Sequence, residues 1–460
     1  MRVLAVSVAP LFRDFVMGGS QRILTDVAVA LGEAGHDVRV LCTRRPENEG
    51  GFSLGPKARV EPDLLLRGAF PSPYEVAPFM LSQTVVRLQE AAGWADRIYL
   101  HADAMFMRQV FGDAPLVRSL HDFVYEEALL SAFSLPAALT IVPSRYLEEC
   151  IEASASASAG PTGPVRVVPN GIRRADNPVH PSPPQGVVPR EPGDLVLLFP
   201  HRLDPRKGLI EALEITALLG SKRPDRRVRL LAPGYPAGAS FDDSAASRDH
   251  VVAMARERGV ESAVEVHGWV PHEQMASYYA FGDVTLCPGN FIEAFGLVPL
   301  ESVAAGTPAI CARVGAFREL EGFPGISHVA YGDVEAAADA VEAAIDGLLD
   351  EAVASAAIDE RYSHRRMLDG YIEAITGPVA TPEAALGSAG ADGYVLAPWC
   401  HLEGDRIYND YLYGYRDMPD LARHLATLPP SGLIPAGAER PVPGLDAALA
   451  DGILVPARRR

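Results

Sequence analysis

The residues best suited to chemistry are two glutamates eight positions apart, Glu293 and Glu301, in the segment EAFGLVPLE. Gly296 and Pro299 lie between them, which favours a loop around Glu293 and a helix around Glu301. The two carboxylates can then contact different parts of one ligand, and a carboxylate accepts hydrogen bonds from both hydroxyls of a vicinal diol. The pair therefore predicts a ligand-binding site. The alternative is two unrelated surface glutamates.

Backbone amides in the same segment favour a ligand rich in oxygen. Phe295, Gly296 and Leu297 stand at the expected start of the helix. The first four N–H groups of a helix have no partner within it, so they are available to hydroxyl or phosphate oxygens. We therefore expect these three residues to contribute to the site through their backbone.

A second chemically suitable group is cationic. Residues 201–208, HRLDPRKG, place Arg202, Arg206 and Lys207 within six positions, between an apolar run and a helix-like run. The chain has 41 Lys and Arg against 59 Asp and Glu, a formal net charge of −18, so this positive charge is a local feature. Arg202 and Lys207 are suited to neutralise a diphosphate, with support from the dipole of the following helix. The alternative is a solvated basic turn.

A diphosphate that departs in a reaction is stabilised either by cationic side chains or by a divalent metal ion. Carboxylate clusters are the usual protein ligands of such ions, and no Asp-x-Asp triplet occurs in the sequence. We therefore expect cationic side chains to stabilise the departing diphosphate, and we predict no metal site.

Gly18 and Gly19 form a third, less specific signal, between the first apolar run and a helix-like run at 22–34. Glycine lets backbone amides approach a phosphate closely, and the N-terminus of a helix adds a partial positive charge. A plain tight turn is the alternative for these two residues.

The first part of the chain alternates between apolar runs and helix-like segments. Strands are expected at 3–8, 38–42, 97–101, 116–121, 139–142 and 165–168. Helices are expected at 22–34 and 146–153. Short aliphatic strands that alternate with helices are typical of a parallel α/β sheet. Residues 1–175 are therefore predicted to form a Rossmann-like domain.

A proline-rich segment separates this part from a second one of the same kind. Residues 176–194 contain six prolines, which disfavour helix and central strand, so we expect an interdomain linker. Further strands are expected at 195–199, 228–232, 264–267, 284–287 and 309–311, with helices at 209–219 and 251–258. Residues 195–376 are therefore predicted to form a second Rossmann-like domain that faces the first.

The remaining residues, 377–460, have a different composition. Ten prolines occur between Pro378 and Pro456, and aromatic residues crowd between Tyr394 and Tyr415. One helix is expected within 417–428, and the rest is predicted to be loops and short strands that pack on another part of the protein.

The overall composition excludes several classes of protein. The acidic net charge disfavours non-specific binding of nucleic acid, and no apolar run approaches the ~20 residues of a membrane-spanning helix. The five cysteines show no C-x-x-C spacing, which favours a reduced, cytoplasmic setting over a disulfide framework. The N-terminal apolar run is broken by Pro10, so we interpret it as a strand and not as a signal peptide.

Taken in order, these motifs resemble those of the retaining GT-B glycosyltransferases of family 4. The resemblance covers residues 1–376, where 361–375 is similar to the family's terminal helix that crosses back to the first domain. It rests on the Gly18-Gly19 loop, the VPNGI segment at 168–172, Arg202 with Lys207, the GWV segment at 268–270, and Glu293 with Glu301.

The resemblance implies a GT-B fold, with two Rossmann-like domains facing a central cleft, to which residues 377–460 are an extension of unknown role. It also implies a role for each site residue. Arg202 and Lys207 would hold the donor diphosphate, and Glu293 with the amides near Phe295, Gly296 and Leu297 would hold the donor sugar. Glu301 would bind the ribose diol, and Trp269 and Val270 would meet the base. Gly18 and Gly19 would approach the phosphate from the other domain, and His121 matches a histidine near the donor sugar.

The activity implied is a hexosyltransferase reaction without a metal or other cofactor. A sugar would pass, with retention, from a nucleoside diphosphate sugar to a hydroxyl, amine or thiol of a small-molecule acceptor. The absence of a Lys/Arg-rich helix in residues 1–175 favours a soluble acceptor over a membrane lipid. The composition, rich in Ala, Pro and Arg, is typical of a bacterium with GC-rich DNA, so an acceptor from secondary metabolism is plausible.

Other interpretations stay open at the level of sequence. One alternative is a catalytically silent partner subunit that binds nucleotide sugars. Another is a sugar phosphorylase with a lysine-bound pyridoxal cofactor. The aromatic segment Tyr394–Tyr415 would line the acceptor side of the cleft, or it would cover an apolar patch or form a homodimer contact.

Overall fold

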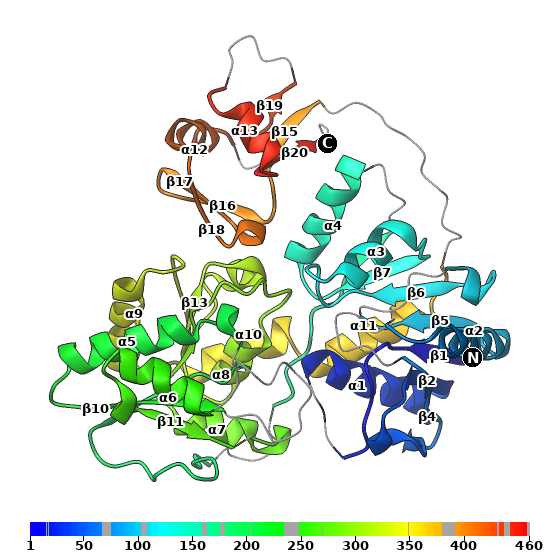
Figure 1. The fold of residues 1–460 in the computed structure, drawn as a ribbon, viewed down its shortest axis with the longest axis horizontal. Helices are drawn as coiled ribbons and strands as arrows, with labels where there is room; N and C mark the ends of the chain where they lie inside the picture. Colours follow the sequence, from blue (N-terminus) through cyan, green and yellow to red (C-terminus); the bar gives the residue numbers. More distant parts are fainter. Residues whose placement is uncertain are drawn as a thin grey trace. The chain divides into compact units, whose positions relative to one another are not determined.

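The computed structural model divides the chain into two compact units (Figure 1). Unit 1 comprises Met1–Asn170 together with Arg365–Arg460, and unit 2 comprises Gly171–His364. The structure describes all residues except 15, 17, 67–74, 103–107, 159–162, 175–179, 203, 234–247, 269, 348, 380–391, 430–431, 437–441 and 458–460.

Unit 1 is built on an eight-stranded sheet that is parallel except at one edge. In spatial order its strands are β3 (Phe52–Gly55), β4 (Ala58–Leu64), β2 (Asp37–Thr43), β1 (Arg2–Val6), β5 (Arg97–Leu100), β6 (Leu116–Ser119), β7 (Leu139–Val142) and β8 (Val165–Val167). Of these, β3 pairs antiparallel with β4, and the other neighbours are parallel. The central strands are buried, as expected for a parallel sheet covered on both faces.

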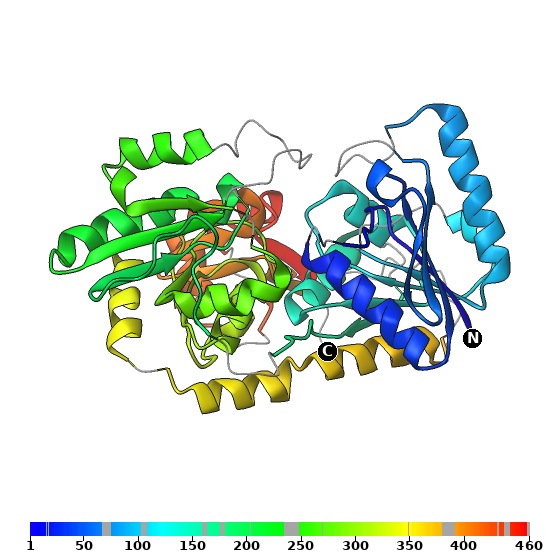
Figure 2. The same ribbon diagram turned by 90° about the horizontal axis from the view of Figure 1, so that it is seen from below.

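Helices cover both faces of this sheet (Figure 2). They are α1 (Gly19–Glu33), α2 (Pro78–Trp94), α3 (Glu126–Ser134), α4 (Arg145–Ser158) and α11 (His364–Thr376). On one face, Ala5 of β1 shares a core with Leu24 of α1 and Tyr371 of α11. On the other face, Leu4 of β1 shares a core with Leu88 of α2. Successive residues of a strand point to opposite faces, so the neighbours Leu4 and Ala5 join different cores.

Unit 2 contains a six-stranded parallel sheet. Its spatial order is β11 (Val264–His267), β10 (Arg227–Pro233), β9 (Asp194–Leu198), β12 (Val284–Cys287), β13 (Ala309–Ala312) and β14 (Ile326–Val329). The helices are α5 (Leu209–Lys222), α6 (Arg248–Glu257), α7 (Met275–Phe281), α8 (Leu297–Ala304), α9 (Val334–Asp346) and α10 (Glu351–Arg361). Leu197 of β9 packs with Leu213 of α5, whereas Leu198 packs with Tyr278 of α7 on the opposite face. The predicted α/β class with two Rossmann-like sheets is therefore confirmed.

Each sheet has one point at which the strand order reverses. In unit 1 the reversal lies between β1 and β5, and in unit 2 it lies between β9 and β12. Open parallel sheets bind ligands beyond the carboxyl ends of the strands at such a switch point. The segments that follow these four strands are therefore where each unit is expected to place its functional residues.

The C-terminal extension forms two small sheets and two helices within unit 1. Its elements are β15 (Gly393–Leu396), β16 (Cys400–Glu403), β17 (Arg406–Asn409), β18 (Gly414–Asp417), α12 (Pro419–Ala426), β19 (Ile434–Pro435), α13 (Leu445–Ala450) and β20 (Leu454–Ala457). β19, β15 and β20 form one sheet, and β16, β17 and β18 form the other. Ala153 of α4 packs against the apolar core of the extension. The expected short strands and the helix within 417–428 are present.

One expected helix begins three residues later than predicted. Residues 361–375 were predicted as a single helix, but α10 ends at Arg361 and α11 begins at His364. Ile172 forms a parallel bridge with Ser363, and its N–H donates to the carbonyl of Tyr362 at 2.7 Å. These contacts come from another segment of the chain, and they coincide with the break between α10 and α11.

The described part of the proline-rich segment is not a separate linker between the two units but belongs to unit 2. The first unit boundary lies between Asn170 and Gly171, so the described part of 176–194 belongs to unit 2. There Val187 is buried, and the carbonyl of Val188 accepts a hydrogen bond from Arg229 at 2.8 Å.

Across the described residues, no helix is both long enough and apolar enough to cross a membrane.

Candidate functional site

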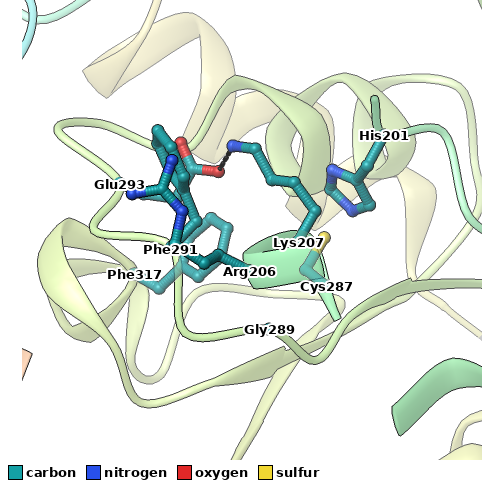
Figure 3. Close-up of a pocket in the computed structure, with 8 residues that line it drawn as sticks. All are labelled: His201, Arg206, Lys207, Cys287, Gly289, Phe291, Glu293 and Phe317. Atoms are coloured by element: carbon teal, nitrogen blue, oxygen red, sulfur yellow. Dashed lines mark hydrogen bonds and ion pairs between the residues drawn. The ribbon is translucent and has the colours of Figure 1, made fainter. Parts of the chain in front are cut away.

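A small pocket lies at the switch point of unit 2, beyond β9 and β12 (Figure 3). Its lining residues are His201, Arg206, Lys207, Cys287, Gly289, Phe291, Glu293 and Phe317. His201 follows β9, and its Nε2–H donates to the carbonyl of Leu286 at 2.9 Å, since a carbonyl oxygen can only accept. The pocket thus combines residues from two segments that are far apart in the sequence.

Lys207 and Glu293 form an ion pair in this pocket, with 2.5 Å between Nζ and Oε1 (Figure 3). The side chains are 12% and 20% exposed, so both charges are largely shielded from water while still reachable. The ammonium group also lies 3.6 Å from the centroid of the Phe291 ring, a cation–π contact. Two residues that the sequence predicted separately are therefore brought together.

A tight backbone contact fixes the position of Lys207. The short helix η3 (Pro205–Lys207) is capped by Asp204, whose Oδ1 accepts from the N–H of Arg206 at 2.9 Å. Gly208 then has a φ of +90°, and a Cβ atom there would lie 2.5 Å from the amide nitrogen of Gly289. Only glycine fits such a conformation and such an approach without strain. The segments after β9 and β12 are thus held against each other, which aligns Lys207 with Glu293.

Arg202 and Arg206 have different environments. Arg206 pairs with Asp204 at 3.0 Å and stacks on Phe291, with 5.1 Å from Cζ to the ring centroid. Arg202 is half-buried and is not among the residues that line the pocket. Burial would raise the pKa of Asp204, but hydrogen bonds from Arg206 and the charge of Arg202 lower it overall. Both guanidinium groups therefore lie near the same carboxylate, and the second pocket cation is Arg206, which the sequence analysis counted but did not assign to the site.

Glu301 lies on α8, as predicted, whereas Glu293 lies in the preceding loop. α8 begins at Leu297, with Gly296 as its N-cap, and no described side chain caps this end. A carboxylate oxygen of Glu301 accepts from the hydroxyl of Tyr279 at 3.2 Å. Burial, followed by the nearby Glu301 charge, raises the pKa of Tyr279, so this phenol stays a hydrogen-bond donor. Glu301 is half-buried, which leaves part of its carboxylate accessible.

Three further residues were assigned to the donor side: Phe295, Val270 and Trp269. The side chain of Phe295 is buried against Tyr362, with ring centroids 5.4 Å apart, so only its backbone can meet a ligand. Val270 is buried in the core with Tyr278. Trp269 lies outside the described residues.

In unit 1, Gly18 and Gly19 lie at the start of α1, next to the switch point between β1 and β5. Both glycines are exposed, and among described side chains none caps this end of α1. The first turn contains no acidic residue. The first amides of a helix lie at its positive end, which favours an anion, and the phosphate contact of these two glycines stays a prediction.

A buried polar network that the sequence analysis did not single out lies below this loop. Nε2 of His101 is 2.8 Å from the carbonyl of Ser20, and this oxygen can only accept, so the proton of the neutral ring is on Nε2. Nδ1 then accepts from the hydroxyl of Tyr99 at 2.8 Å, and Tyr99 is 2.9 Å from the hydroxyl of Ser119. His101 directly follows β5, and that position at the switch point was the only sequence signal for it.

His121, which follows β6, lies beside this network. Its ring centroid is 4.7 Å from that of His101, and Nε2 is 3.4 Å from the hydroxyl of Tyr371 on α11. Burial lowers the pKa of His121 to about 4. Burial, and then the neighbouring His121, lower the pKa of His101 well below its usual value. Both rings are therefore neutral near pH 7, and His121 can act as a polar contact without adding charge.

The comparisons with known structures identify the class of fold. The structure is similar to that of the Anabaena protein HepE in complex with UDP-glucose, with a TM-score of 0.61 and 18% identity, over 82% of this chain and all of that one. It is also similar to sucrose-phosphate synthase from Thermosynechococcus elongatus, with a TM-score of 0.57 and 20% identity, over 81% of this chain and 94% of that one. Two parallel α/β sheets of this kind define the GT-B fold of glycosyltransferases.

Sequence comparisons then give the family. The model "Glycosyltransferase Family 4" matches residues 17–175, and the model "Glycosyl transferases group 1" matches residues 186–358. A D-inositol 3-phosphate glycosyltransferase of Thermobispora bispora is 27% identical over 65% of this chain and 75% of its own length. One of Corynebacterium glutamicum is 37% identical, but over only 26% of this chain and 27% of its own length. The chain belongs to the GT-B glycosyltransferases of family 4, and it is a transferase enzyme.

Proposed function

We propose that this enzyme transfers a sugar from a nucleoside diphosphate sugar to a small-molecule acceptor, with retention at the anomeric carbon and without a divalent metal ion. The observation that supports this most directly is the shielded ion pair between Lys207 and Glu293 at the switch point of unit 2. In a glycosyltransferase, a fixed cation at this place is suited to a departing diphosphate, and a fixed carboxylate is suited to sugar hydroxyls.

The proposed division of labour combines the positions of Lys207 and Glu293 with the sequence resemblance, which assigns Arg202. Lys207 and Arg202 stabilise the negative charge that develops on the departing diphosphate oxygen, so they bind the transition state more tightly than the ground state. Glu293 orients the sugar by accepting from its hydroxyls. When the donor binds, the diphosphate replaces Glu293 as the closest anion to Lys207, which frees the carboxylate for this task.

The rest of the donor contacts come from the start of α8 and from unit 1. The amides at Gly296 and Leu297, at a helix start that no described side chain caps, bind sugar oxygens. Glu301 accepts from the ribose diol while Tyr279 fixes its orientation. His121 contributes a neutral hydrogen-bonding ring to the sugar. The amides of Gly18 and Gly19 contribute to binding of the phosphate.

The acceptor is proposed to be a small polar molecule. The relatives named above are D-inositol 3-phosphate glycosyltransferases, so an inositol phosphate is the first acceptor to assay. The five cysteines are buried free thiols, which supports work in a reducing, cytoplasmic setting.

Two assays test this function. A thermal-shift screen of uridine, guanosine, thymidine and adenosine diphosphates should identify the base, since a ligand at 100 times its Kd stabilises by ~2.7 kcal/mol. The matching sugar nucleotides are then incubated with D-inositol 3-phosphate, with and without EDTA, and the released nucleotide and the anomeric configuration of the product are measured. Activity that disappears with EDTA would contradict the metal-independent mechanism, and an inverted product would contradict retention.

The silent-subunit alternative predicts a different result from the same assays. A binding subunit would show a thermal shift with a nucleoside diphosphate but no release of nucleotide from any sugar donor, with or without acceptor. Because the pair formed by Lys207 and Glu293 is intact, we favour the active enzyme.

A further inference from the structure

The C-terminal extension reaches the ligand-binding edge of the unit 1 sheet. Its short helix η7 (Asp410–Leu412) follows β17 and makes hydrogen bonds to two separate places in the N-terminal part of the chain. The hydroxyl of Tyr411 donates to the carbonyl of Phe123 at 2.7 Å. The hydroxyl of Tyr146 donates to the carboxylate of Asp410 at 2.8 Å.

Both of these contacts lie beyond the carboxyl ends of strands. Phe123 belongs to the loop after β6, two residues after His121, and Tyr146 is at the start of α4, after β7. The carboxyl ends of parallel strands meet at one edge, which is the edge that binds ligands. The extension is therefore attached to the same edge that carries His121, and not to a distant surface of the unit.

The turn that makes these contacts is held rigidly. The side-chain oxygen of Asn409 accepts from the N–H groups of Tyr411 at 2.9 Å and Leu412 at 3.3 Å. The N–H of Asp410 donates to the carbonyl of Trp399 at 2.9 Å, and the Trp399 ring meets Tyr411 edge to face, with centroids 5.7 Å apart.

The end of the turn is also unusual. Tyr413 has a φ of +52°, a left-handed conformation that a bulky residue adopts only where its surroundings impose it. Asp410 is fully buried, and its contact with Tyr146 satisfies a carboxylate oxygen that would otherwise be costly to bury. Such a turn is suited to fix the loop that it touches.

We propose that Tyr411 is a positioning residue for the glycosyl transfer reaction: its hydrogen bond to Phe123 holds the loop after β6, and thereby the ring of His121, in the orientation that the sugar requires. This inference rests on the proposed function. It gives the extension a part in the activity, beyond covering an apolar surface.

A substitution of one hydroxyl tests this inference better than removal of the extension. The apolar core of the extension includes contacts with Ala153 of α4, so deletion would expose apolar surface and confuse folding with activity. Tyr411→Phe keeps the ring and its contact with Trp399 and removes only the hydrogen bond to Phe123. Tyr394→Phe, in β15 of the same extension, is the matched control, since the structure gives its hydroxyl no hydrogen bond to a described residue.

Two measurements are made on the full-length protein and both variants. The first is hydrogen–deuterium exchange of the peptide that contains residues 120–125. Tyr411→Phe is expected to increase exchange there about fivefold, since one anchor of a local opening is lost, and Tyr394→Phe is expected to match wild type. The second is nucleotide release from the best sugar nucleotide of the screen, together with the Kd of its nucleoside diphosphate.

In the kinetic assay, Tyr411→Phe is expected to lower turnover about tenfold, the effect of one lost hydrogen bond, with the Kd unchanged. A purely structural role would instead lower the melting temperature without changing turnover of the folded enzyme. Unchanged exchange in residues 120–125, or increased exchange with wild-type turnover, would overturn the proposal. Absence of nucleotide release from wild type would overturn the proposed function, and the exchange measurement would then still decide whether Tyr411 holds the loop.

Discussion

The two Rossmann-like sheets differ in the polar side chains that lie beyond the carboxyl ends of their central strands. In unit 2 the segments after β9 and β12 bring together a charged pair, Lys207 and Glu293. In unit 1 the segments after β5 and β6 bring together two neutral histidines, His101 and His121. Under the proposed function, the first site would stabilise charge and the second would orient the sugar by hydrogen bonds.

If the proposed function is right, this difference predicts which unit contributes more to turnover. A developing anion is stabilised by fixed cations, whereas a neutral ring adds orientation and little charge. Variants in unit 2 should therefore have the larger effects on turnover, and variants in unit 1 the smaller ones.

The largest effect is expected for Lys207→Ala. Loss of the preorganised ammonium group should lower turnover about 100- to 1,000-fold, because one charge partner of a developing anion contributes ~2 to 4 kcal/mol. Steady-state release of nucleotide measures it. Lys222→Ala is the control, since Lys222 lies on α5 of the same unit and pairs with Asp339. Turnover within a few-fold of wild type in Lys207→Ala would remove Lys207 from the mechanism.

The next comparison separates the two arginines. We expect Arg202→Ala to lower turnover about 100-fold, as a second cation of the departing diphosphate. Arg206→Ala should change it by less than about threefold, because Arg206 is already paired with Asp204 and is 40% exposed. Parallel measurements of kcat and donor KM decide the assignment. The reverse order of effects would make Arg206, which lines the pocket, the functional cation.

The two glutamates should differ in the kinetic parameter that they change. Glu301→Ala is expected to weaken donor binding about tenfold with little change in kcat, since its contact with the ribose is the same in ground and transition states. Glu293→Ala is expected to lower kcat about tenfold or more, since it also leaves Lys207 without its partner. Titration calorimetry of the donor and steady-state rates measure the two. Equal effects on affinity alone would contradict this division.

The smallest effect concerns stability and pH in unit 1. The pKa of His121 is about 4 in the folded protein and near 6.5 when unfolded, so between these values the unfolded state binds a proton that the folded state does not. The free energy of unfolding should therefore fall as the pH falls from 6.5 to about 4.

Urea unfolding of wild type and His121→Gln at about pH 7.5 and about pH 4.5 measures this effect. The variant should lose less stability on acidification than wild type. His180→Gln, at an exposed position of unit 2, should behave as wild type. An identical loss in His121→Gln would show that His121 is not a source of the acid sensitivity.

Much of the fold was predictable because its strands are short, continuous apolar runs. β7, β11 and β12 begin and end at the predicted residues. β7 and β12 are fully buried, and short apolar runs between polar turns leave a clear pattern. α2 was not predicted: it is rich in apolar residues, but Phe79 and Val86 among them are 67% and 51% exposed, so its apolar residues do not mark one buried face. The break between α10 and α11 coincides with a contact from Ile172, nearly two hundred residues earlier, and no local pattern contains such a contact.

The candidate site was predictable residue by residue but not as an arrangement. Residue type and spacing indicated Lys207 and Glu293, yet their direct pairing depends on the close approach of Gly208 and Gly289. His101 carried no motif, and its importance appears only through its contacts with Ser20 and Tyr99. The attachment of Tyr411 to Phe123 joins segments 288 residues apart, so sequence patterns alone could not indicate it.

Helix α11 has a practical consequence for anyone who would dissect or recombine this enzyme. Met367 and Tyr371 complete the core on one face of the unit 1 sheet, although the chain reaches them only after all of unit 2. A fragment that stops at residue 170 would lack them and expose that face to water, so it should aggregate. Residues 171–364, by contrast, form a compact unit from one uninterrupted stretch of chain. A chimera that borrows the N-terminal half from a relative must therefore exchange two stretches of the gene at once.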